Sequence, residues 1–271
     1  MARLRLPGLK LGGTSWVIPG GFADNMRELS RDVDDMQFVL FDNKYGSNIP
    51  TKEEVRELAE LRRELGMSCV VHFPDDVCLS ADPKERVRCE DSCLRMLELF
   101  DEIEPYAWVM HLGGEQFGDR PSADMDKWFE LTAKSVERIA SAARERSRIC
   151  AETLDYNFEM VLPIVKEHKI SVCADIGHLV RYGRPVEEQL KLFLEYTHVV
   201  HIHGVTPEGV DHRDMTYFDE GLLDRVLAIL ASDGRTRVMT IEVFEEDYAR
   251  SIEFLRKFAL KRAKEDMNAN A

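Results

Sequence analysis

Short apolar runs alternate with longer amphipathic runs along the whole chain. The runs that we expect to form strands are 11–15, 36–41, 68–72, 108–111, 149–153, 171–175, 199–203 and 238–243. The expected helices are 23–31, 51–65, 83–102, 123–146, 157–168, 185–195, 219–232 and 245–265. Several strand runs are apolar nearly throughout, which is typical of parallel strands covered on both faces. About eight strand–helix pairs predict an α/β fold, a (β/α)8 TIM barrel.

The chain is expected to form one domain over residues 1–271, with a polar tail that frays over residues 263–271. Its length is close to the ~250 residues of a typical barrel of this kind. The rival fold is an open doubly wound sheet, which usually carries a glycine-rich phosphate turn after its first strand. The segment Thr14–Gly21 after the first expected strand does not fit that turn.

Charge and cysteine usage restrict the classes of partner. The formal net charge is −14, so phosphate repulsion argues against a nucleic acid partner. No apolar run approaches the ~20 residues that span a bilayer, and the start of the chain lacks a signal-peptide pattern. The six cysteines form no CxxC pair and are expected to be reduced thiols. We expect a cytoplasmic monomer or homodimer that acts on a small molecule.

Metal-ligand side chains lie where the expected strands end. Strand ends point at the active site in barrel enzymes of this class. The side chains concerned are His72, His111, Glu152, Asp175, His178, His203 and Glu242. Buried carboxylates repel one another, and a divalent cation relieves that repulsion. Imidazole with carboxylate suits zinc, manganese, iron or cobalt.

Each of these residues also has a structural interpretation. A single buried histidine is more often a hydrogen-bonded core group than a ligand. His201 shares a strand face with His203, and we expect it one layer deeper, supporting the ligands. Cys150 and Cys173 are expected to point inward beneath the site as packing residues. The loop residues Asp211, His212 and Asp214 either add a ligand or base or form a polar surface loop.

The whole chain resembles the xylose-isomerase-like barrels, which include sugar epimerases and endonuclease-IV-type enzymes. The resemblance rests on Glu152, the Asp175–His178 stretch DIGH, the His201–Gly204 stretch HIHG and Glu242. For an epimerase it implies one metal on Glu152, Asp175, His203 and Glu242. For the nuclease branch it implies two more histidines, His72 and His111, and a third metal on His178 and the loop residues Asp211 and His212. Asp211 and His212 are adjacent here, whereas that branch has Asp-x-His.

More narrowly, the chain resembles the cobamide-remodelling phosphodiesterases. The stretches that carry this likeness are 71–74, 152–156, 173–179, 201–205 with 211–212, and 241–244. It implies hydrolysis of the nucleotide-loop phosphodiester of a corrinoid substrate, a cobamide, giving cobinamide phosphate and an α-riboside. Two or three ions of Zn²⁺ or Mn²⁺ would act, with Glu152 bridging two of them. His178 and His212 would hold a further cation or donate hydrogen bonds to the phosphate.

Three alternatives remain at this point. A sugar isomerase or epimerase would use one divalent metal, with Glu152 and Glu242 as acid and base, but would not need His72 and His111. A binding module would hold metal or corrinoid without turnover, and a DNA-repair nuclease is weakened by the acidic charge. The aromatic residues Trp16, Tyr45, Phe73 and Phe117 are candidates for stacking on a large planar ligand.

Overall fold

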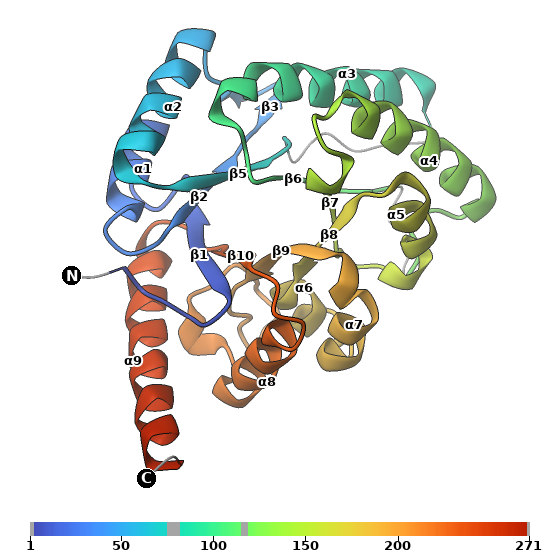
Figure 1. Cartoon of the computed structure of the whole chain (residues 1–271). Helices are drawn as coiled ribbons and strands as arrows, with labels where there is room; N and C mark the ends of the chain where they lie inside the picture. The colour runs from blue at the N-terminus through green and yellow to red at the C-terminus, as the bar shows by residue number, and fades with distance from the viewer. Residues whose placement is uncertain (1–2, 75–81, 115–118, 270–271) are drawn as a thin grey trace.

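The computed structural model describes residues 3–74, 82–114 and 119–269. Within these ranges eight parallel strands close into a barrel in the order β1-β10-β9-β8-β7-β6-β5-β2, and helices surround it (Figure 1). The strands are β1 Leu9–Thr14, β2 Asp35–Val39, β5 Ser68–His72, β6 Ala107–Met110, β7 Ile149–Glu152, β8 Ser171–Asp175, β9 Thr197–Ile202 and β10 Arg237–Ile241. The predicted TIM barrel is therefore confirmed.

The helices follow the expected ranges with small differences at their ends. They are α1 Phe22–Leu29, α2 Lys52–Leu65, α3 Pro83–Leu99, α4 Met125–Ala142, α5 Leu162–His168, α6 Ile176–Arg181, α7 Val186–Phe193, α8 Glu220–Ala231 and α9 Glu246–Ala269. α2 begins with a capping box, since the Thr51 hydroxyl accepts from the Glu54 amide and the Glu54 carboxylate accepts from the Thr51 amide.

One helix and one hairpin were not predicted from the sequence. α6 is a short helix directly after β8, and β3 Asp42–Asn43 pairs with β4 Gly46–Ser47 in a small hairpin after β2. Both are too short to give a periodic pattern. They occupy loops that follow barrel strands, which is where barrel enzymes build their active sites.

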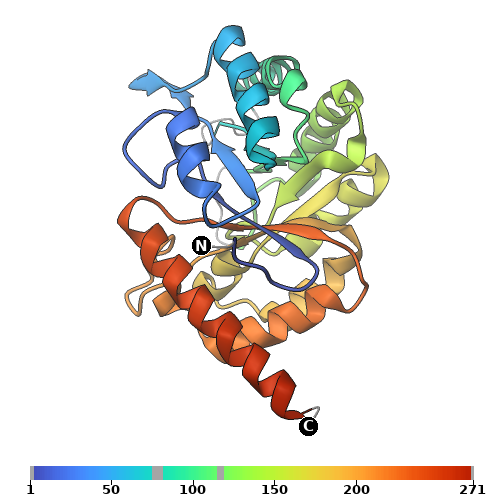
Figure 2. The same cartoon turned by 60° about the vertical axis from the view of Figure 1, so that its left-hand side comes forward.

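The tail expected to fray from residue 263 is helical as far as Ala269. α9 is held against α8 by ion pairs, with 2.8 Å between Lys261 Nζ and Glu220 Oε2 and 3.3 Å between Arg262 Nε and Asp224 Oδ1. Its end projects beyond the barrel in Figure 2. Of the helices in the described ranges, none is long and apolar enough to cross a bilayer.

The apolar core has two parts. The larger part fills the layer between the strands and the surrounding helices. The smaller part fills the barrel interior with Val70, Ala107, Val109, Cys150, Cys173, Val199 and Val238. The two cysteines thus lie in the barrel interior, as expected. This apolar floor keeps water from entering the barrel below the carboxyl ends of the strands.

Asp35 is a fully buried acid at the start of β2. Gly12 in the neighbouring strand makes room for it, because a Cβ at position 12 would lie 3.1 Å from the Asp35 Cβ. Burial raises the pKa of Asp35 to about 7, and Ser68 and Lys10 offset this only in part. The native state therefore binds a proton that the unfolded chain releases near its ordinary pKa. This contribution to stability is largest at acidic pH and is lost as the pH rises through about 7.

We expect Asp35→Asn to remove this pH dependence. The unfolding free energy of the variant minus that of wild type should be up to ~3 kcal/mol larger at pH 8 than at pH 4.5, since each pKa unit is about 1.4 kcal/mol. Urea unfolding of both proteins in metal-free buffer measures the difference. The exposed Asp126 gives the control Asp126→Asn, which should show no such gain. An equal offset between Asp35→Asn and wild type at both pH values would contradict the assignment.

Candidate metal centre

Side chains that could hold metal ions gather at the carboxyl ends of the barrel strands. In the described part of the chain, three adjacent groups consist of histidines and carboxylates alone, and a fourth combines Cys173 with Glu152 and His201. The first group is His72, His111 and Glu152; the central group is Glu152, Asp175, His201 and Glu242; the third group is Asp175, His178, His203 and His212. Within each group the ligand atoms lie within 4.8 Å of one another. Glu152 belongs to the first and central groups and Asp175 to the central and third. The three groups therefore form one continuous site.

The first group is arranged around one oxygen of Glu152. His72 Nε2 lies 3.1 Å and His111 Nε2 lies 3.3 Å from Glu152 Oε2. His72 Nδ1 lies 2.7 Å from the Phe73 carbonyl oxygen. Because a carbonyl only accepts, His72 Nδ1 carries a proton, and Nε2 is left to face the carboxylate, to which it donates unless a metal ion takes the place of its proton.

The central group is arranged around Nδ1 of His201. This atom lies 3.0 Å from Glu242 Oε2 and 3.4 Å from Glu152 Oε1. The sequence placed His201 one layer below the ligands, and that prediction was wrong. Across β8 and β9, Asp175 pairs with His201, so the two side chains reach the same height in the barrel. An irregularity in the pairing at Val172 and Cys173 contributes to this register.

Gln37 on β2 fixes the tautomer of His201. The Gln37 amide nitrogen donates to Glu242 Oε1 at 3.0 Å, and its oxygen lies 2.7 Å from His201 Nε2. An ionised carboxylate can only accept, so the amide nitrogen must face Glu242 and the amide oxygen must face His201. His201 Nε2 then carries a proton, and Nδ1 is left to face the carboxylates. Sequence reasoning missed Gln37, although a polar residue inside the apolar run 36–41 was a usable signal.

The third group forms where β8 turns into α6. The Asp175 carboxylate caps α6 by accepting from the His178 amide at 2.7 Å. His203 Nε2 lies 3.3 Å from Asp175 Oδ1. A Cβ on Gly177 would lie 2.2 Å from the His203 ring, so only glycine fits between Asp175 and His178. His212 stacks on His203 with ring centroids 4.3 Å apart. His203, expected at the central metal, thus lies in the third group.

Asp211 is not brought into these groups. Its carboxylate pairs with the Arg181 guanidinium, and 3.4 Å separates its Oδ1 from His212 Nδ1. His212 has a φ of +53°, and this left-handed backbone turns the imidazole toward the site while Asp211 faces Arg181. The predicted Asp211 ligand is therefore not supported by the geometry. Asp214 instead caps a short turn by accepting from the Thr216 amide.

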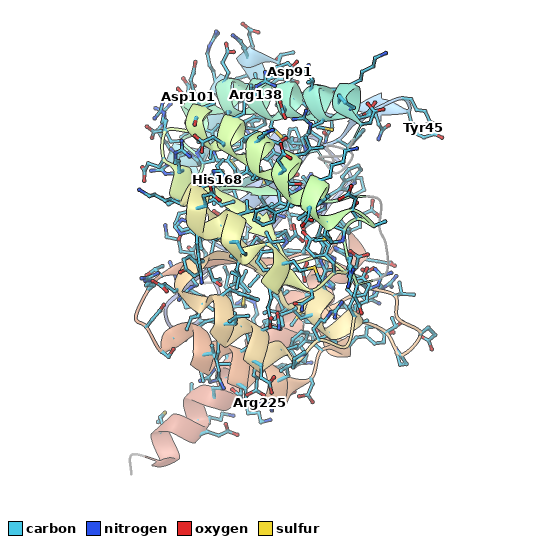
Figure 3. The ribbon with its side chains drawn as sticks, turned by 90° about the vertical axis from the view of Figure 1, so that its right-hand side faces the viewer. Tyr45, Asp91, Asp101, Arg138, His168 and Arg225 are labelled. Carbon is cyan, nitrogen blue, oxygen red and sulfur yellow. The ribbon has the colours of Figure 1, made fainter. Side chains whose placement is uncertain are left out.

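Two further histidines, His168 and His198, belong to none of these groups. His168 lies on α5 in the outer helical layer (Figure 3). Its Nδ1 lies 2.9 Å from Glu137 Oε2. His198 stacks on Tyr106, with centroids 4.5 Å apart. Among the aromatic candidates, Phe73 is buried against Trp108 and cannot reach a ligand. Phe117 lies outside the described residues.

The electrostatics of the metal-free site favour cations. Burial alone would raise the pKa of Glu152, but His201 and His111 outweigh it and hold that pKa well below its ordinary value. Burial alone would lower the pKa of His201, but Cys173, Glu242 and Glu152 raise it well above the usual range. The acids are thus ionised, and imidazolium protons supply the balancing charge. Divalent cations compete with those protons for the same positions.

Unpartnered buried atoms show that these residues fit metal ions. Among the described residues, Asp175 Oδ2, His201 Nδ1 and His203 Nε2 are buried and have no hydrogen-bond partner. Such orphaned atoms are costly unless an ion or water meets them. The donor set of imidazole and carboxylate suits zinc or manganese. The side chains of His111 and His212 are 25% and 29% exposed, so the site opens to solvent at these two residues.

We expect wild-type protein to bind two or three Zn²⁺ or Mn²⁺ ions per chain. Glu152→Gln should lose more metal than His111→Ala, because Glu152 lies in both the first and the central group and His111 in the first alone. Elemental analysis after dialysis against the metal measures both. A single ion in the wild type would contradict the three-group arrangement.

Because Gln37 fixes the tautomer of His201, we expect Gln37→Leu to weaken metal binding. Residues that orient ligands typically contribute 10–100-fold to affinity, so we expect a loss of about that size for the tightest Zn²⁺ site. Competition with a chromophoric chelator measures it. Gln189 on α7, which contacts Glu159 outside the site, offers the matched control Gln189→Leu. Equal affinities in the two variants would rule out the role of Gln37.

Comparison with solved structures supports the fold. A D-tagatose 3-epimerase-like protein matches with a TM-score of 0.76 and 20% identity over 95% of this chain and 99% of that chain. A 3-keto-D-glucoside 4-epimerase from E. coli matches with a TM-score of 0.71 and 14% identity over 93% and 99%. Endonuclease IV from Thermus thermophilus matches with a TM-score of 0.68 and 19% identity over 93% and 99%. At these identities the likeness establishes the fold alone.

Sequence comparison places the chain in a family. A search of curated proteins finds no match. A family model described as xylose isomerase-like TIM barrel matches residues 32–258, which include the metal-ligand residues of all three groups. The chain therefore belongs to the xylose isomerase-like TIM barrel family.

Proposed function

We propose that the chain is a metal-dependent phosphodiesterase. The observation that carries this proposal is the continuous site in which Glu152 and Asp175 each belong to two ligand groups. A row of adjacent cation positions suits a phosphodiester, because both the attacking and the leaving oxygen need charge stabilisation. A site built for one metal has no use for His72 and His111, which lie 3.1 and 3.3 Å from Glu152.

The position of each residue in the site indicates its role in hydrolysis. Bound divalent cations would neutralise the phosphoryl oxygens and lower the pKa of an attacking water. Glu152, fully enclosed between histidines, would hold the first and central positions together. His212 lies at the solvent-facing side of the site and can donate to a phosphoryl oxygen, and His178 next to it can do the same. Gln37 and Thr153 would keep the ligands in place, since the Asp175 amide donates to the Thr153 hydroxyl at 2.8 Å.

The proposed substrate is the nucleotide-loop phosphodiester of a cobamide. Support comes from the sequence likeness to the cobamide-remodelling phosphodiesterases, which includes the stretches around Glu152, Asp175 and His203. The products would be cobinamide phosphate and the α-riboside of the lower ligand. The negative overall charge fits a small-molecule substrate better than DNA.

Sugar epimerisation is a second candidate, and on the structural comparisons alone it is the better supported of the two. The D-tagatose 3-epimerase-like protein and the 3-keto-D-glucoside 4-epimerase match with TM-scores of 0.76 and 0.71, against 0.68 for endonuclease IV. Glu152 and Glu242 both lie within 3.4 Å of His201 Nδ1, so they could serve as acid and base around one central metal. Epimerisation around one metal would not require His72 and His111 of the first group.

We expect the metal-loaded protein to convert cobalamin to cobinamide phosphate and the free riboside, as identified by mass spectrometry. EDTA should abolish the reaction, and Zn²⁺ or Mn²⁺ should restore it. Glu152→Gln should reduce turnover at least ~100-fold, because it removes a ligand shared by two groups. Glu159, exposed and outside the site, provides the control Glu159→Gln.

The same preparations should be assayed on D-tagatose, on a 3-keto-glucoside and on DNA with an abasic site. Epimerisation that depends on both Glu152 and Glu242, without any cobalamin hydrolysis, would replace the phosphodiesterase by the second candidate. Cleavage of the DNA would assign the site to nucleic acid repair instead. Full hydrolysis by Glu152→Gln would exclude the mechanism proposed here.

A further inference from the structure

A cavity of about 460 Å³ is lined by the loop after β1 and the segment from β2 to the start of α2, which includes the hairpin. Its lining includes Trp16, Phe22, Phe41 and Ile49. This volume falls within the range of small-molecule pockets, ~300–1,000 Å³. Loops that follow barrel strands are the ones that select substrates in this fold. None of the three metal-ligand groups contributes to this lining.

The wall of the cavity contains an aromatic pair. Trp16 and Phe41 stack with centroids 5.8 Å apart and an angle of 26° between the rings. Trp16 is 40% exposed, whereas the other two tryptophans, Trp108 and Trp128, are 5% and 2% exposed. An indole left in water next to a parallel ring offers its free surface for a further planar group.

The polar side chains of the lining are used by the fold itself. Asn48 accepts from the Phe41 amide at 2.7 Å and donates to the Val39 carbonyl at 2.9 Å. Ser15 accepts from the Val39 amide at 3.0 Å, and Glu54 closes the capping box of α2. Their positions are therefore fixed without a ligand.

The charge of the cavity argues against an anionic occupant. Among the described residues that line it, there is no lysine, arginine or histidine, and Glu54 is the one charged group. A phosphate would find no counter-charge there. The hydroxyls of Ser15 and Ser47 can still donate to a ring nitrogen.

Backbone contacts connect this wall to the metal centre. The Thr14 hydroxyl donates to the carbonyl of Val243, the residue after the ligand Glu242, at 2.8 Å. The Trp16 carbonyl accepts from the Glu245 amide at 2.9 Å. Phe244, which lies between Val243 and Glu245 in the chain, stacks on the ligand candidate His212, with ring centroids 6.0 Å apart. A molecule held by the metal groups could thus extend into the cavity.

We propose that the cavity binds an uncharged, planar heteroaromatic part of the substrate, stacked on Trp16, while the phosphodiester lies at the metal groups. This inference rests on the proposed phosphodiesterase function and adds how the non-reacting end is recognised. An unmodified sugar carries hydroxyls around its ring and would leave the apolar wall unfilled. The separation of a flat apolar pocket from a cationic centre matches a ligand with one flat end and one anionic centre.

The test measures binding separately from turnover. Isothermal titration of the EDTA-treated protein with a benzimidazole riboside should give saturable binding, and titration with ribose should give none. Trp16→Ala should weaken riboside binding about tenfold, as expected for the loss of one stacking partner, and Trp16→Phe should restore most of it. Leu260→Ala, at an exposed position of α9 far from the cavity, is the control and should bind as the wild type does.

The outcomes separate this inference from the proposed function. Riboside binding that is unchanged in Trp16→Ala, with circular dichroism confirming that the variant is folded, would overturn the pocket assignment even if cobalamin is hydrolysed. Absence of cobalamin hydrolysis with Trp16-dependent riboside binding would overturn the phosphodiesterase and leave the pocket in place. With both intact, Trp16→Ala should also raise the KM for cobalamin more than it lowers kcat.

Discussion

The constraint on which this structure depends is the burial of three carboxylates, Glu152, Asp175 and Glu242, in one barrel mouth. Each is buried, and each would repel the others without balancing positive charge. The histidines of the three ligand groups surround them and supply either protons or ligands for cations. The folding of this region therefore depends on the protonation of these histidines and on any metal ions that replace their protons.

The barrel arranges apolar, ligand and solvent-facing side chains in separate layers along its axis. The lower interior is filled by valines, alanine and two neutral cysteines, and burial raises the pKa of the Cys173 thiol. Above that floor Gln37 determines which nitrogen of His201 carries the proton. The rim above holds His111 and His212, which are part-exposed and can meet a substrate. A dry floor, a fixed ligand layer and an open rim together define where chemistry takes place.

In the function proposed here, the loops that follow β1 and β2 would add substrate recognition to the metal groups. Their aromatic wall is tied by hydrogen bonds to the segment after Glu242, so the pocket and the ligands keep a fixed relation. The pocket has no cationic residue among its described lining, while the centre is built to hold cations. Substrate choice within this family can then change through loops without disturbing the metal groups.

The sequence by itself determined the barrel and most members of the candidate metal-ligand groups. Apolar strands and amphipathic helices alternate with clear periods, and His72, His111, Glu152, Asp175 and Glu242 end their strands in a way that the barrel topology forces to converge. It also located the third-group histidines His178, His203 and His212, though not their grouping. These features are local along the chain and can therefore be predicted from the sequence.

Tertiary structure alone decided the rest, because it depends on how strands are staggered and how loops turn. The pairing of β8 with β9 raised His201 to the height of Asp175, and the left-handed backbone at His212 sent Asp211 to Arg181. The hydrogen bonds of Gln37 join strands more than 160 residues apart, since its partner is His201. The burial of Asp35 likewise follows from packing against Gly12 in a neighbouring strand. Register and loop conformation are set by contacts between distant segments, and no local pattern encodes them.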